Sequence, residues 1–133
     1  MPRISLRSVA GFVVIIAIAF SISGERAGAA VDMSIGTRSV VQNGPASQCS
    51  TRAKNALNSV LQNAAEAGAG TGQWFAYGPR DSSGNSSVAA TIHCFPVGKG
   101  YVASFTCAVE VPPSAESASA LCTKLTGSFG SAK

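Results

Sequence analysis

The sequence predicts an α+β domain with the element order α-β-β-β-α, in which a three-stranded antiparallel meander carries two helices on one face and two disulfides staple the layers. Two observations carry this prediction. Apolar residues recur at helical spacing near both ends of the domain and at strand spacing between them. All four cysteines of the chain fall on these apolar stripes, at Cys49, Cys94, Cys107 and Cys122.

The first 29 residues have the parts of a secretory signal peptide. Arg3 and Arg7 give a positive start, an apolar run follows over residues 9–22, and Ala27-Gly28-Ala29 supplies a small-x-small cleavage site. A membrane-spanning helix needs about 20 apolar residues, and this run is shorter. We therefore expect cleavage after Ala29, with Ala30 as the alternative, and a periplasmic or secreted protein without membrane attachment.

The rest of the chain predicts one domain. Residues 30–46 are expected to form an irregular lead-in, and residues 47–133 a single small disulfide-stapled unit. The chain has a formal net charge of +4; after signal removal seven Lys and Arg remain against five Asp and Glu, so 7 − 5 = +2. Because the basic residues are scattered, the composition gives no case for a nucleic-acid partner.

Periodicity and turn residues set the expected elements. Residues 49–67 place apolar side chains on one helical stripe, and Gly68 ends that helix. Residues 73–77 form a short aromatic strand, and residues 88–95 and 101–111 form two longer strands joined by a hairpin. These three strands are expected to alternate between an apolar face and a mixed one, as in a sheet with helices on one side.

A second helix is expected after the third strand. Pro112-Pro113 ends that strand, because proline cannot donate to the sheet. Ser114 is the expected cap, with Glu116 in the first helical turn, and Gly127 the expected end.

The cysteines predict two structural disulfides, because an oxidising compartment favours them. Zinc sites and thioredoxin-like redox sites typically use cysteines at C-x-x-C spacing, which the chain lacks. No metal or other cofactor is therefore expected. In a meander whose first helix runs opposite to the first strand, Cys49 approaches Cys107 and Cys122 approaches Cys94. We expect these two pairs; Cys94–Cys107 is disfavoured, because hairpin register separates the two residues.

The parts of most enzyme sites are missing from the sequence. His93 is the only histidine, and no acid lies near it in sequence to orient it. No serine sits in a G-x-S-x-G elbow. A non-enzymatic protein is therefore expected, with a small hydrolase using His93 and a carboxylate as the alternative.

Aromatic residues gather in the short strand over residues 73–77. Alternation puts Phe75 and Tyr77 on one face and Trp74 on the other, beside a polar loop with Arg80 and Asp81. Exposed aromatics next to such a loop are typical of protein-binding surfaces, which makes these five residues the candidate site. The alternative, that both faces are covered and the aromatics fill gaps in the core, remains open.

The layout of the chain resembles that of small exported bacterial proteins of uncharacterised function. The resemblance rests on the four cysteines and on the segments FTCAVEV and ALCTKL, and it covers roughly residues 49–129. It implies a fold and a compartment and carries no site residues. The expected function is that of an accessory or binding module whose partner is another envelope or extracellular protein, with a structural envelope component as a further alternative.

Overall fold

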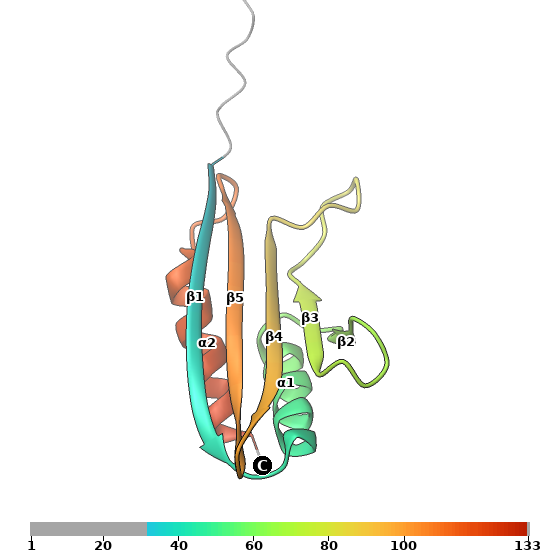
Figure 1. Cartoon of the computed structure of the whole chain (residues 1–133). Coiled ribbons are helices and arrows are strands. Elements are labelled where there is room, and N and C mark those ends of the chain that lie inside the picture. Colours follow the sequence, from blue (N-terminus) through green and yellow to red (C-terminus); the bar gives the residue numbers. More distant parts are fainter. Residues whose placement is uncertain (1–31, 133) are drawn as a thin grey trace, which may run out of the picture.

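The computed structural model describes residues 32–132, so the expected signal peptide lies outside the described residues. Figure 1 shows the chain as a sheet with two helices behind it. The elements are β1 (Asp32–Asn43), α1 (Ala46–Val60), β2 (Ala65–Glu66), β3 (Gln73–Tyr77), β4 (Val88–Val97), β5 (Gly100–Val111) and α2 (Ala118–Ser131).

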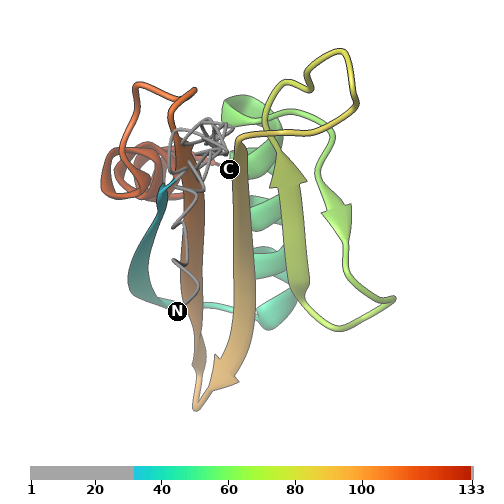
Figure 2. The same cartoon turned by 90° about the horizontal axis from the view of Figure 1, so that it is seen from above.

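The sheet is antiparallel and five-stranded, in the order β1-β5-β4-β3-β2. Figure 2 shows from above that α1 lies behind β4 and β3. The predicted α+β class, the two helices and the three central strands β3, β4 and β5 are confirmed. The three-stranded meander is wrong in strand number, because β1 and β2 extend it at its two edges.

The expected irregular lead-in over residues 30–46 is wrong for most of its length. Residues 32–43 form β1, which pairs with β5 from Asp32↔Val111 to Asn43↔Gly100 without a bulge. At Gly36 the strand touches α2: an added Cβ would lie 2.9 Å from the backbone of Ala118. Glycine thus allows the start of α2 to pack directly on the backbone of β1.

The core lies between the sheet and the two helices. Phe129 of α2 packs its ring edge-on against Phe105 at 5.3 Å and Tyr101 at 6.3 Å between centroids. All four cysteines are buried in this layer, as predicted from their apolar stripes. The other fully buried large side chains are Leu57, Ile92, Leu121, Leu125 and Val109.

Two disulfides are present, but the expected pairs Cys49–Cys107 and Cys94–Cys122 are wrong. The bonds join Cys49 to Cys94 and Cys107 to Cys122, with Cα–Cα distances of 5.9 and 5.8 Å. As expected, Cys94 and Cys107 are not bonded to each other.

The direction of α1 explains the first wrong pair. β1 ends beside the β4–β5 hairpin, where the Gly44 N–H donates to the Lys99 carbonyl at 3.3 Å, so α1 begins at the hairpin end near Cys94. After α1 the chain returns along the sheet as β2 and the loop that follows it. In consequence α1 and β3 run in the same direction (Figure 1), opposite to the prediction.

The start of α2 explains the second wrong pair. Ser117, not Ser114, caps this helix, and its hydroxyl accepts from the Ala120 N–H at 3.1 Å. Cys122 therefore lies in the first turns, beside Cys107, and does not extend along the sheet to Cys94. The helix also passes through Gly127, its expected end, and continues to Ser131.

Helix α1 ends at Val60, seven residues before its expected end at Ala67. Gln62 and Asn63 have φ angles of 71° and 50°, which turn the chain out of the helix. The Asn58 side chain accepts from the Ala64 N–H at 2.7 Å and holds the chain in this turn. In the described part of the chain, neither helix is long and apolar enough to span a membrane.

Candidate binding surface

The face of the sheet opposite the helices is open and carries both polar and apolar side chains. Residues paired across antiparallel strands share a face, and buried Ile92 and Phe105 mark the face beneath the helices. Among the described residues, six of the seven large apolar side chains that are exposed lie on the open face. They are Met33, Ile35, Val41, Tyr77, Phe95 and Val97. The gathering of exposed apolar side chains on one face makes that face the candidate interaction surface.

Three of the predicted site residues form a row at one side of this face, which we call the aromatic row. Phe75 meets Tyr77 edge-on with 5.7 Å between ring centroids, and the Arg80 guanidinium lies 5.6 Å from the Tyr77 centroid. Arg80 is held from its other side by a hydrogen bond from Nη1 to the Gly84 carbonyl at 2.7 Å. The Tyr77 residue is 47% exposed, so the row is ordered by its own contacts while remaining accessible.

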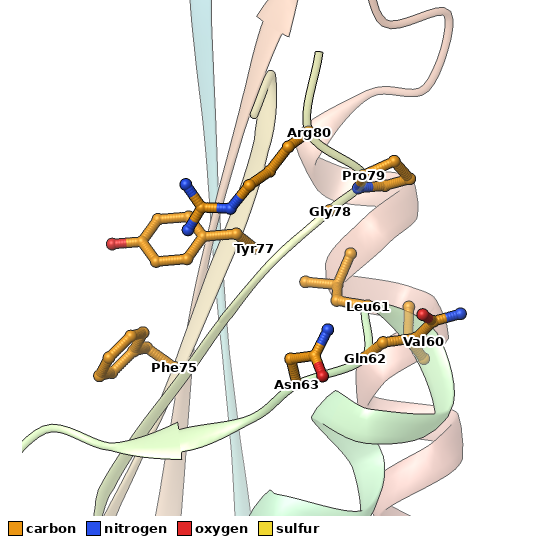
Figure 3. A pocket seen from close by; sticks show the side chains of 9 residues that line it. All are labelled: Val60, Leu61, Gln62, Asn63, Phe75, Tyr77, Gly78, Pro79 and Arg80. Atoms are coloured by element: carbon orange, nitrogen blue, oxygen red, sulfur yellow. The ribbon is translucent and has the colours of Figure 1, made fainter. Parts of the chain in front are cut away.

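A hollow of about 370 Å³ lies next to the row. Figure 3 shows its lining: residues 60–63, where the chain leaves α1, face the end of β3 and the segment 78–80. The two left-handed residues Gln62 and Asn63 line it. Non-glycine residues in this conformation cost free energy and are found preferentially at functional sites.

The backbone of Tyr77 faces this side of the sheet. The Gly78 N–H donates to the Val88 carbonyl of β4 at 2.8 Å, and bonding directions alternate along a strand, so the N–H and C=O of Tyr77 point away from β4. Strand β2 pairs with Trp74 and Phe75 and ends before reaching Tyr77. A short stretch of the β3 edge is therefore open beside the aromatic row.

Trp74 lies on the other face of β3, between the sheet and α1. Its indole N–H donates to the Ser50 hydroxyl at 2.6 Å, and the Lys54 ammonium lies 5.7 Å from the ring centroid. Trp74 is half-buried and packs against the core. Trp74 therefore links β3 to α1 and does not share a surface with Phe75 and Tyr77. For Trp74 alone, this agrees with the alternative in which the aromatic residues fill gaps in the core.

Asp81 organises its own loop. Its Oδ1 accepts from the Ser83 and Asn85 N–H groups at 2.8 and 2.9 Å. The structure thus brings together Phe75, Tyr77 and Arg80, and gives Asp81 a local structural contact. Gln62 and Asn63 were missed because they continue a polar helical face in the sequence; the asparagine, which tolerates left-handed backbone, was the one signal present.

His93 lies half-exposed on the open face, with its ring 3.9 Å from that of Phe95. Within residues 32–132 no hydrogen bond or ion pair joins His93 to a carboxylate; the ion pair found there is Lys124–Glu116, at 2.6 Å. The same part of the chain holds no group of three or more His, Cys, Asp or Glu side chains placed to bind a metal.

In comparisons with known proteins, no family model, no curated protein and no solved structure matches the chain.

Proposed function

We propose that the protein is an exported, non-enzymatic binding module that holds an extended segment of another envelope or extracellular protein against the aromatic row. One observation carries the proposal: exposed Tyr77 and Arg80 and half-exposed Phe75 are fixed by mutual contacts, with 5.6–5.7 Å to ring centroids, beside a hollow. Exposed apolar side chains that are held in place lose little conformational freedom when a partner binds.

The chemistry of the row favours a protein as the partner. Tyrosine and arginine are enriched among the residues that dominate protein–protein binding energies. The outward N–H and C=O of Tyr77 offer hydrogen bonds to the backbone of an extended segment, as in strand addition. The hollow between Asn63 and Pro79 would take a side chain of that segment.

Two features support export. Both disulfides are of the kind that persists in oxidising compartments. The first 29 residues have the charge and hydropathy pattern of a cleavable signal. Sequencing of the N-terminus of the protein recovered from outside the cytoplasm tests this part: Ala30 or Val31 is the expected first residue, and recovery of the intact Met1 chain would contradict it.

The binding proposal is tested by a double variant. A photoreactive amino acid at position 79, next to the row, is used to trap and identify the partner, and the affinity of the purified partner is then measured. Tyr77→Ala with Arg80→Ala should weaken binding at least a hundredfold, because two such side chains together contribute about 3 kcal/mol or more. The melting temperature should stay near that of the wild type, since both residues are exposed.

Phe95→Ala provides the matched control. Phe95 is an aromatic residue of similar exposure, 41%, on the same face, but it lies near the other end of β4 from Ala89, the partner of Tyr77. Binding should survive this change. Equal loss of affinity in both variants, or retention in the double variant, would refute the proposed site, and loss of an enzymatic activity in His93→Ala would favour the hydrolase.

A further inference from the structure

Strand β1 leaves a long sheet edge without a neighbour in the described part of the chain. It is twelve residues long and pairs with β5 on one side. The opposite edge of the sheet is closed differently: β2 is two residues long and follows the left-handed turn of Gln62 and Asn63. Short edge strands and sharp turns block pairing with other chains, and β1 has neither.

The hydrogen-bonding direction of each β1 residue follows from its neighbours. The Glu110 N–H donates to the Ser87 carbonyl, so the even-numbered residues of β5 bond to β4 and the odd-numbered ones to β1. The β1 partners of those odd-numbered residues are even-numbered. The backbone groups that point outward from the edge therefore belong to Met33, Ile35, Thr37, Ser39, Val41 and Asn43.

These six residues are also the ones whose side chains lie on the open face, and all six are exposed. Met33, Ile35 and Val41 are 68%, 64% and 74% exposed. No lysine or proline occurs in residues 32–43, although natural proteins commonly use both to prevent edge pairing. The edge combines unpaired backbone groups with apolar side chains.

We propose that β1 pairs antiparallel with β1 of a second copy, about a two-fold axis through Thr37, and joins the two sheets into one. The outward backbone groups face one another only if the paired residue numbers are both odd. A two-fold axis at Thr37 satisfies this condition. Met33 of each copy then pairs with Val41 of the other, and Ile35 of each copy pairs with Ser39 of the other.

The neighbouring register is disfavoured by charge. An axis at Arg38 also pairs odd-numbered residues, but it places the two Arg38 side chains directly opposite each other, and like charges in that position are destabilising. With the axis at Thr37, Arg38 lies opposite Gly36 of the second copy, so the two Arg38 side chains do not face each other. The central pair is then Thr37 with Thr37, a favourable cross-strand combination. This self-complementarity is why we assign the edge to a second copy.

The helices leave room for this arrangement. Helix α2 begins over Gly36, where Ala118 contacts the strand, and ends near Tyr101, the partner of Gln42. It therefore covers one half of β1. In the antiparallel pair, the half of β1 that α2 covers lies beside the uncovered half of the second β1. The two α2 helices therefore extend in opposite directions from the two-fold axis.

Cysteine cross-linking tests the register on the full chain, exported and processed by its host. Thr37→Cys brings two thiols together at the axis, where Cα atoms of a hydrogen-bonded pair lie about 5.5 Å apart, within the range of a disulfide. Ser39→Cys is the matched control, because the Cα atoms of its two copies would lie about 14 Å apart. A covalent dimer should form in the first variant and not in the second, with both native disulfides retained by peptide mapping.

Sedimentation velocity tests whether the dimer forms through the β1 edge or through the open face of the sheet. Thr37→Lys should raise the dimer dissociation constant at least tenfold, because it places two ammonium groups opposite each other. Thr106→Lys is the control: Thr106 is exposed on the same face and directly opposite Thr37, but it lies on β5, one strand in from the edge. Its dimer should remain. A monomeric wild type at millimolar concentration, cross-linking through Ser39→Cys, or equal dissociation in both lysine variants would overturn the proposal.

Discussion

The two disulfides should stabilise the protein by different amounts, because they close loops of different length. Cys49–Cys94 spans 45 residues and Cys107–Cys122 spans 15. In the chain-entropy description, closing these loops in the unfolded state contributes about 4 kcal/mol for the longer and about 3 kcal/mol for the shorter. Domains of this size have unfolding free energies of about 5–15 kcal/mol, so either loss should be large.

The measurement compares two double variants, Cys49→Ala with Cys94→Ala, and Cys107→Ala with Cys122→Ala, by urea unfolding followed with circular dichroism. All four cysteines are buried to a similar degree, so the truncation itself affects both variants alike. The midpoint should fall in both, and further in the first. A loss below about 1 kcal/mol in both variants, or a larger loss by about 1 kcal/mol in the second, would refute the loop-length reasoning.

Two further predictions concern packing. Phe129→Ala should lower the unfolding free energy by about 3–5 kcal/mol, because Phe129 is fully buried against two aromatic rings; thermal melting checks this, and a loss below 1 kcal/mol would contradict the packing of α2. Gly36→Ala should cost about 1–3 kcal/mol, because the new Cβ meets the Ala118 backbone. Gly127→Ala, in open space within α2, should instead gain up to about 1 kcal/mol, and an equal response of both glycine variants would contradict the contact at Gly36.

The central strands could be predicted because their apolar faces point at the core. Tyr101, Phe105 and Val109 alternate with polar residues, and burial on one face is the signal that periodicity detects. Strand β1 lacks that signal because its pattern is inverted. Its face toward the helices carries Gly36 and Arg38, while Met33 and Ile35 face the open side.

The wrong partner expected for Cys49 has a similar origin. Leu61 and Ala64 continue the apolar stripe of α1, so periodicity predicts a longer helix than the one that forms. The chain instead turns at Gln62 and returns along the sheet, and this return reverses the direction of α1 relative to β3. A two-residue strand such as β2 carries no periodicity that would have revealed it.

The layout of the candidate site could be predicted in part. The aromatic strand was placed correctly at residues 73–77, and alternation separated Trp74 from Phe75 and Tyr77. Which face α1 would cover depends on contacts between residues far apart in sequence, such as Trp74 with Ser50. The hollow beside Tyr77 depends on the backbone at Gln62 and Asn63, which a propensity argument assigns to the helix.

The order of the cysteines along the chain has a consequence for biosynthesis. Each disulfide joins one cysteine to the next in sequence, first Cys49 to Cys94 and then Cys107 to Cys122, so the two covalent rings follow one another and do not interlock. Chains emerge from the ribosome, or from a translocation channel, amino end first. An oxidant that links cysteines in the order of their arrival produces the native pairs directly. Oxidation in that order would leave no mispaired bonds to reshuffle.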